Sequence, residues 1–398
     1  MVFRQSSRSK ISEVTCLRLF LILVILFFEF QRAYAQVEPP QIEAESAILV
    51  ELSTGRVIFD KNADVTRPPA SMTKMMTCVL GLENLTKRSL VRISESAAYT
   101  EDNTFYWTPG DVLQADEVML GMMMVSDNGA AVAIAEAVAG SVADFTMLMN
   151  KRASELGCTD THFANPNGLP NDNHYSTARD MAKIATYAMS IPDFRDIVAM
   201  RKAVIHWRSP AEKWSEAENT NELLGVYDGM TGIKTGWTRA AGGCLAASAK
   251  RGGVELVAII MHSTDTNTRF VDARKLLDYG FSVIKMTRTI NRDRAQKVVF
   301  VKDGVKATVH VRPLEDLNFP LLEGEDPKKL KVSYELPKIV SAGVKQGEIL
   351  GKSELKYRGK TLASVPLIAE ESVDKGFSFT STLIGLVEPV INLVSFLV

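Results

Sequence analysis

Hydrophobic positions in the first 280 or so residues predict a strand, a long helical section and then two further strands. Residues 47–52 (AILVEL) form a continuous apolar run that predicts a buried strand, and a Ser-Thr-Gly turn leads from it into 56–60. Apolar side chains then recur every three or four residues, which predicts helices. The predicted helices cover 71–80, 115–125, 130–139, 142–156, 177–190 and 268–281.

The two later apolar runs, 244–249 and 256–261, read as central strands after a glycine-containing turn at 228–232. Strand-forming segments near both ends, with helices between them, predict an α/β fold. We expect a sheet with helices on both faces and a helical subdomain beside it.

The pattern changes near Lys285, where short runs alternate between apolar and polar residues. Residues 298–301 and the valines and alanine of 305–311 flank a Lys-Asp-Gly turn, which predicts a hairpin. Similar runs continue to Ile368. We therefore expect a separate β-sandwich-like domain at 285–375, following a first domain at 36–284.

The N-terminus has the layout of a secretory signal peptide. A basic start is followed by the apolar run 19–28 and by the small residues Ala33 and Ala35. An uncleaved anchor helix is the alternative, but Glu29 and Arg32 interrupt the run short of the roughly 20 residues that span a bilayer. We expect cleavage after Ala35, which removes residues 1–35 and places the protein outside the cytoplasm.

The C-terminal segment is apolar and carries its few polar or small residues on one helical face. Residues 377–398 contain no basic side chain, and the polar positions recur at steps of three and four. A core helix and a spanning helix are alternatives. Pro389 and the polar stripe favour a helix at 376–398 that lies in a membrane interface.

Composition excludes some classes of function. The chain has 398 residues, enough for two domains, and its net charge of −1 gives no sign of a nucleic-acid partner. Cys78, Cys158 and Cys244 are the cysteines after residue 35, and their apolar surroundings predict buried thiols without catalytic duty. The five histidines lack the spacing of a metal site, so we expect no metal and no cofactor.

Three short motifs carry the candidate chemistry. In the first, a helix would place Lys74 one turn from Ser71, where a neutral lysine can remove the hydroxyl proton. In the second, Ser126 and Asn128 project from one tight turn between two helices, where they can relay a proton and hold a peptide amide. A surface helix start and a helix cap are the plain structural alternatives for these two motifs.

The third motif, Lys234-Thr235-Gly236, is placed at the head of a strand. Lys234 offers a cation and Thr235 a hydroxyl. Gly236 has no side chain, so a substrate backbone can pass close to the strand there. Its plain alternative is a turn entering a strand.

Together the motifs resemble the SxxK, SxN and KTG set of penicillin-binding proteins and class A β-lactamases. The surrounding residues of 67–77, 165–169, 176–181 and 232–242 are similar to those of the serine D-alanyl-D-alanine carboxypeptidases, low-molecular-weight penicillin-binding proteins. This resemblance implies a β-lactamase/transpeptidase-like catalytic domain with an antiparallel sheet, followed by a small all-β domain. It also implies removal of the terminal D-alanine from peptidoglycan pentapeptide stems, β-lactams as covalent inhibitors, and a periplasmic protein peripherally attached to the outer face of the cytoplasmic membrane.

The resemblance further implies a role for each site residue. Ser71 is acylated, Lys74 acts as base, Ser126 shuttles the proton and Asn128 positions the peptide. The substrate-binding residues of this region are Lys234, Thr235, Gly236 and Trp237. Lys234 and Thr235 would bind the terminal carboxylate of the substrate. Backbone N–H groups of Ser71 and Trp237 would form the oxyanion hole.

One departure concerns the second motif. The family often has Ser-Gly-Asn-Asp, whereas this chain has Ser126-Asp127-Asn128-Gly129. The serine and asparagine that the chemistry needs are present, while substrate placement near Asp127 is open.

Three other functions compete with this interpretation. A class A β-lactamase needs a deacylating glutamate after the second motif, and the chain has none between Glu155 and Glu212. A D,D-endopeptidase on the same scaffold stays open. A catalytically idle envelope protein is disfavoured, because all three motifs are complete.

Overall fold

The first part of the protein is built around one antiparallel sheet. The computed structural model describes residues 37–293, 297–357 and 359–380. Five strands lie in the order β2-β1-β9-β8-β7, and every neighbouring pair is antiparallel. Their bounds are β1 (Ser46–Glu51), β2 (Arg56–Lys61), β7 (Met230–Thr238), β8 (Gly242–Arg251) and β9 (Val254–Ser263).

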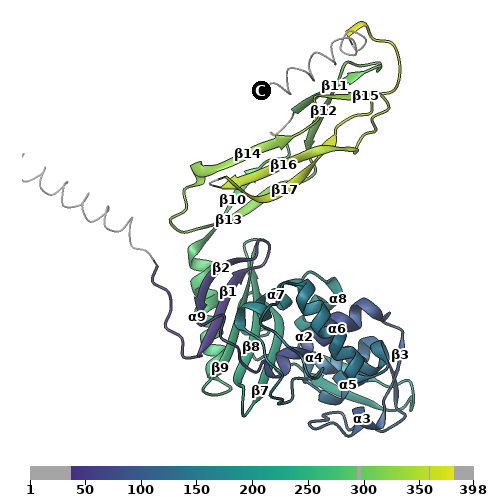
Figure 1. The fold of residues 1–398 in the computed structure, drawn as a ribbon, viewed down its shortest axis with the longest axis vertical. Helices are drawn as coiled ribbons and strands as arrows, with labels where there is room; N and C mark the ends of the chain where they lie inside the picture. The colour runs from purple at the N-terminus through teal and green to yellow at the C-terminus, as the bar shows by residue number, and fades with distance from the viewer. Residues whose placement is uncertain (1–36, 294–296, 358, 381–398) are drawn as a thin grey trace, which may run out of the picture. The chain divides into compact units, whose positions relative to one another are not determined.

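Both faces of this sheet are buried, which explains the continuous apolar runs in its strands. Side chains alternate between faces along a strand. Ile48 and Val50 of β1 therefore join the core shared with the large helical section, while Ala47 and Leu49 join the core under α9 (Thr268–Val283). Figure 1 shows α9 on one side of the sheet and the other helices across from it. The α/β prediction is confirmed.

The helical section forms because alanine and methionine side chains line the inner faces of its helices. Some of these helices have local end signals: Ser141 and Thr177 accept backbone N–H groups at the starts of α6 and α7, and Gly140 ends α5 in the left-handed region. The elements are the 3₁₀ turn η1 (Ala70–Thr73), α2 (Lys74–Asn84), α3 (Glu95–Ala98), α4 (Ala115–Met124), α5 (Asn128–Ala139), α6 (Val142–Glu155), α7 (Ala178–Ala188) and α8 (Pro192–Ala199).

Two small two-stranded sheets accompany the helices, and the sequence patterns do not indicate them. They pair β3 (Leu90–Arg92) with β4 (Val112–Gln114), and β5 (Lys202–His206) with β6 (Trp214–Glu218). Both are short and partly exposed, so they lack the continuous apolar run that marks a buried strand.

In the residues that the structure describes, the second part of the protein (285–375) is all-β apart from one short 3₁₀ turn. A six-stranded sheet has the order β14-β16-β17-β12-β11-β15, and β10 pairs with β13. The bounds are β10 (Ile284–Ile290), β11 (Lys297–Lys302), β12 (Thr308–Pro313), β13 (Leu317–Leu322), η2 (Pro327–Lys329), β14 (Leu330–Glu335), β15 (Ile339–Ser341), β16 (Ile349–Tyr357) and β17 (Lys360–Ala369). The predicted hairpin is present as β11 and β12, although β12 begins later than expected, after the exposed Val305.

The structure corrects two placements within the motifs. Ser71 lies on η1, just ahead of the α-helix, because Ala70 has a positive φ of 47° that prevents a regular helical start. Lys234-Thr235-Gly236 lies inside β7 and not at its head. The predicted turn was too long, since Met230 and Gly232 already pair with β8.

Other predictions fall on the chain ends and the cysteines. Cys78, Cys158 and Cys244 are buried free thiols, as predicted. The signal peptide at 1–35 and residues 381–398 of the tail lie outside the described residues. Within the described range, no single helix is long and apolar enough to cross a membrane, while the bent pair α5–α6 passes that test by length and composition alone.

Candidate active site

The predicted nucleophile Ser71 and the predicted base Lys74 lie one turn apart, where η1 leads into α2. Lys74 Nζ donates to Ser71 Oγ at 3.0 Å, to Asn128 Oδ1 at 2.6 Å and to the carbonyl oxygen of Asn167 at 2.7 Å. The lysine is completely buried, whereas Ser71 is partly exposed. A substrate can therefore reach the serine while the amine behind it stays out of water.

Burial makes Lys74 suitable as a general base. Removal from water lowers its pKa from 10.5 to about 7, although the nearby carboxylates Asp127 and Asp102 act in the opposite direction. A lysine with such a pKa is partly neutral at physiological pH. Its free amine can then accept the proton of Ser71.

The second motif occupies the turn between α4 and α5. Ser126 has a positive φ of 67°, a conformation that non-glycine residues rarely adopt and that is common at functional sites. Asp127 caps α5 by accepting the N–H of Ala130, and Asn128 begins the helix. The side chain of Asn128 is thereby brought onto Lys74.

The third motif brings the middle of β7 against the nucleophile. A Cβ on Gly236 would lie 3.0 Å from the backbone nitrogen of Ser71 and 3.2 Å from the Cβ of Ala70. Such contacts are tighter than nine in ten real Cβ contacts, so a side chain here would require β7 or η1 to shift by a few tenths of an ångström. Lys234 is buried, and burial together with the charges of Lys74 and Arg269 lowers its pKa.

Two side chains beside the third motif were missed in the sequence analysis. Thr220 Oγ1 lies 2.6 Å from Thr235 Oγ1, and Arg269 on α9 donates to the carbonyl oxygen of Gly236 at 2.7 Å. Thr220 precedes the motif by 15 residues and Arg269 follows it by more than 30. No local pattern marks either residue, because only the fold of β7, β8 and α9 brings them together.

A third missed contact links the nucleophile turn to a buried histidine. His174 Nδ1 accepts the N–H of Ala164, so its Nε2–H donates to Thr73 Oγ1 at 2.7 Å, and Thr73 in turn donates to the carbonyl oxygen of Ala70. Burial lowers the pKa of His174 to about 4, so the ring is neutral. Through these hydrogen bonds His174 has a structural role, which is to hold η1 in place.

Two predicted site residues make fewer contacts than the rest. Among the described residues, no hydrogen bond joins the Ser126 hydroxyl to Lys74 or Lys234, and the Trp237 side chain is about half exposed. Their positions follow from the chain alone: Ser126 is two residues before Asn128, and Trp237 directly follows Gly236. Of the predicted residues, Lys74 and Gly236 thus lie against the partly exposed Ser71, and Asn128 is connected to it through Lys74.

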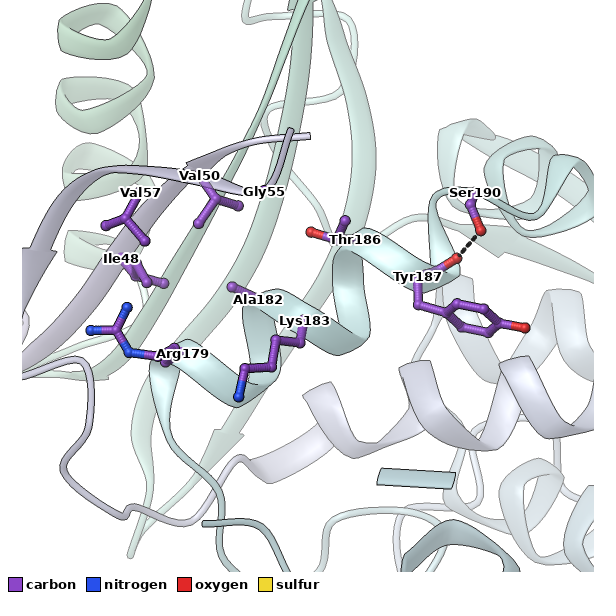
Figure 2. A pocket seen from close by; sticks show the side chains of 10 residues that line it. All are labelled: Ile48, Val50, Gly55, Val57, Arg179, Ala182, Lys183, Thr186, Tyr187 and Ser190. Carbon is purple, nitrogen blue, oxygen red and sulfur yellow. Dashed lines mark hydrogen bonds between the residues drawn. The ribbon is translucent and has the colours of Figure 1, made fainter. Parts of the chain in front are cut away.

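A separate cavity of about 500 Å³ lies between β1, β2 and α7 (Figure 2). Its lining includes the apolar side chains of Ile48, Val50 and Val57. Arg179 and Lys183 face it but are ion-paired with carboxylates. No residue of the three motifs lines this cavity, so it is distinct from the catalytic site.

Comparison with known families agrees with this geometry. Residues 33–265 match the D-alanyl-D-alanine carboxypeptidase family, and residues 285–375 match the C-terminal domain of penicillin-binding protein 5. The chain belongs to the D-alanyl-D-alanine carboxypeptidase family. The second match accounts for the all-β part as a domain found in penicillin-binding proteins.

Individual members of the family match most of the chain. The D-alanyl-D-alanine carboxypeptidase DacF of Bacillus subtilis is 34% identical over 84% of this chain and 86% of its own length. DacA of Escherichia coli is 32% identical over 85% of this chain and 86% of its own length.

Solved structures of the family have the same fold. Penicillin-binding protein 5 from Haemophilus influenzae aligns with a TM-score of 0.66 at 29% identity, covering 85% of this chain and all of the solved one. A DD-transpeptidase from Streptomyces aligns with a TM-score of 0.59 at 31% identity, covering 62% of this chain and all of its own. The similar structures thus include one named as a penicillin-binding protein and one named as a DD-transpeptidase.

Proposed function

We propose that this chain is a serine D-alanyl-D-alanine carboxypeptidase that removes the terminal D-alanine from peptidoglycan pentapeptide stems through an acyl-enzyme on Ser71. The observation that carries the proposal is the buried Lys74, whose amine lies 3.0 Å from the Ser71 hydroxyl and whose pKa is about 7. Family membership supports the hydrolase activity and a role in the cell wall.

In the first half of the reaction, neutral Lys74 takes the proton of Ser71 as its Oγ attacks the penultimate D-alanine carbonyl. Backbone N–H groups of Ser71 and Trp237 stabilise the oxyanion, because the close approach of Gly236 brings β7 beside Ser71. Ser126 carries the proton to the leaving amine, and D-alanine departs.

Substrate recognition and the second half of the reaction use the remaining residues. Lys234 and Thr235 bind the terminal carboxylate, and Asn128 holds the peptide amide. Water then attacks the ester carbonyl, which releases the shortened stem and returns the proton to Ser71. β-Lactams acylate the same serine because they resemble the D-alanyl-D-alanine terminus.

The direct test compares wild type with Ser71→Ala. We expect the wild type to release D-alanine from a pentapeptide-terminated stem and to bind labelled penicillin covalently, and the variant to do neither. Ser96→Ala, an exposed serine on α3, is the matched control and should behave like the wild type.

Labelling without release of D-alanine would point to another acyl acceptor or to a cross-link substrate, as in a transpeptidase or an endopeptidase. A folded wild type that neither binds penicillin nor releases D-alanine would contradict the proposal.

We further propose that the protein acts in the periplasm, on the outer face of the cytoplasmic membrane. The basic and apolar N-terminus supports export, and the amphipathic pattern of 376–398 supports peripheral attachment. Phe377 and Phe379, at the start of that segment, are exposed.

The attachment is tested by ending the chain at residue 376. The truncated protein should move from the membrane to the soluble periplasmic fraction while keeping its rate of penicillin binding. Continued sedimentation with membranes would refute the attachment.

A further inference from the structure

A buried carboxylate in the second motif has no part in the chemistry described so far. Asp127 is completely buried, yet among the described residues its hydrogen-bond partners are all neutral N–H groups and none is a cation. Its Oδ1 accepts from the indole N–H of Trp107 at 2.8 Å and from the N–H of Ala130 at 2.7 Å. Its Oδ2 accepts from the N–H groups of Thr104 and Phe105 at 2.7 and 3.3 Å.

These contacts require an ionised carboxylate. Burial raises the pKa of Asp127, while the four N–H groups oppose that shift. Every one of these partners is a donor, so a protonated carboxyl would point its O–H at an N–H group. The anion is therefore the form that the site accepts, and each donor contact is a charge-assisted hydrogen bond.

Three of the four donors come from the 101–107 loop, which also holds Asn128. The side-chain N–H of Asn128 donates to the carbonyl oxygen of Glu101 at 3.0 Å, while its Oδ1 accepts from Lys74. Asp127 anchors the same loop a few residues further on. The position of Asn128 thus depends on a loop that Asp127 ties to the start of α5.

The charge of Asp127 acts on the general base as well. Asp127 and Asp102 raise the pKa of Lys74, whereas burial lowers it to about 7. The other charged or titratable groups near this lysine are Lys234 on β7 and His174 before α7, and Lys74 lowers the pKa of both. Asp127 is the buried anion among them.

The next glycine fits the same arrangement. A Cβ on Gly129 would lie 2.5 Å from the carbonyl oxygen of Ala97 and 2.8 Å from Trp107 Cδ1, so a side chain there would displace the indole that donates to Asp127. The order Asp127-Asn128-Gly129 therefore places the acid where the loop can surround it and leaves room for Trp107.

We propose that Asp127 is a positioning residue for the acylation of Ser71: its carboxylate ties the 101–107 loop to α5, fixes Asn128 and offsets the charge of Lys74. The inference rests on the proposed acyl-enzyme at Ser71. The same experiment therefore measures penicillin labelling of wild type and Ser71→Ala. If the wild type is not labelled, the proposed function fails. If only the wild type is labelled but the Asp127 variant behaves like it, this inference alone fails.

The test measures the rate of penicillin acylation against pH for the full-length protein. The rate of the wild type should rise with pH and level off above about 7, where Lys74 is neutral. Asp127→Asn keeps the size of the side chain but removes the charge and one acceptor. Its midpoint should move to lower pH by roughly half a unit or more, and its plateau should fall by about tenfold, because Asn128 is held less firmly.

Two further variants separate positioning from general destabilisation. Asp272→Asn removes another fully buried carboxylate, on α9, that accepts the N–H groups of Glu43 and Ala44, and it should leave midpoint and plateau unchanged. Trp107→Phe keeps the charge of Asp127 but removes one donor, so the plateau should fall while the midpoint stays. Thermal unfolding of each variant shows that it is folded.

The outcomes decide the proposal in either direction. A lower midpoint for Asp127→Asn, with the two controls as described, supports it. An unchanged midpoint in Asp127→Asn, or an Asp272→Asn variant that loses acylation equally, would overturn it. If Asp127→Asn does not fold, Trp107→Phe decides the question. A plateau of its acylation rate equal to that of the wild type would overturn the proposal, since the loop would then not position Asn128.

Discussion

At the scale of single residues, the site depends on side chains kept in unusual ionisation states by burial. Lys74 and His174 both lie in the interior, and removal from water is the largest cause of their lowered pKa values. The two neutral forms have different uses. Neutral Lys74 is the proposed base for Ser71, whereas neutral His174 donates to Thr73 and holds η1 in place.

His174 makes the stability of the protein depend on pH. Its pKa falls from 6.5 to about 4 on folding, so below pH 6.5 the unfolded chain binds a proton that the folded protein does not. The free energy of unfolding should therefore fall between about pH 6.5 and pH 4, by about 3 kcal/mol in total.

Urea unfolding of wild type and His174→Gln at pH values near 7 and near 4.5 measures this effect. The variant should be less stable near pH 7, because its amide replaces the ring imperfectly, and should lose less stability on acidification. Equal losses in both proteins would show that His174 does not titrate differently in the two states.

At the scale of elements, the active site exists because β7 and η1 lie in contact. Gly236→Ala should hold the strand and the nucleophile turn apart, since the added Cβ would be 3.0 Å from the nitrogen of Ser71. We expect a destabilisation of about 1–2 kcal/mol and a loss of roughly 100-fold in the rate of acylation, because small displacements of reacting groups are costly.

Gly280→Ala is a matched control for crowding without involvement of the site. Its Cβ would lie 2.6 Å from Leu256 Cδ1 and 2.7 Å from Leu49 Cδ2, where α9 packs on the sheet. It should lower the melting temperature and leave acylation unchanged. If Gly236→Ala acylates as fast as Gly280→Ala, the close approach of β7 is not needed for the reaction.

At the scale of the whole molecule, the two parts have separate hydrophobic cores. The buried residues of the two clusters of the catalytic part lie between Ile42 and Leu277, and those of the two clusters of the all-β part lie between Val299 and Val373. Ile284 and Met286 of β10, where the all-β part begins, pack against the margin of the second catalytic cluster, but none of the described clusters has buried members from both parts. Each part therefore has the packing that an independent domain needs.

A fragment of residues 36–284 should consequently fold and react with penicillin at a rate within about twofold of the full-length protein, with a melting temperature lower by a few degrees. Gel filtration, thermal unfolding and labelling measure this. Aggregation of the fragment, or a tenfold slower reaction, would show that the all-β part supports the catalytic one.

Sequence patterns predicted the larger elements well because those elements bury continuous apolar surface. The predicted helix 115–125 is α4, the helix 142–156 is α6, and the runs 244–249 and 256–261 are the cores of β8 and β9. The patterns were less informative where burial is partial. They do not indicate the hairpin β5–β6, and they predict a turn at the start of β7 because Gly229 directly precedes the strand and Gly232 lies within it.

The sequence by itself determined the chemistry of the site, since Ser71, Lys74, Asn128 and Lys234 occur in three motifs whose order is characteristic of one family. Only the tertiary structure decided which other side chains contact the residues of these motifs. Thr220, Arg269, His174 and the carboxylate contacts of Asp127 join the site. The reason is physical: desolvation and hydrogen bonding depend on neighbours that are distant in the chain, and only the packed sheet and helices bring those neighbours together.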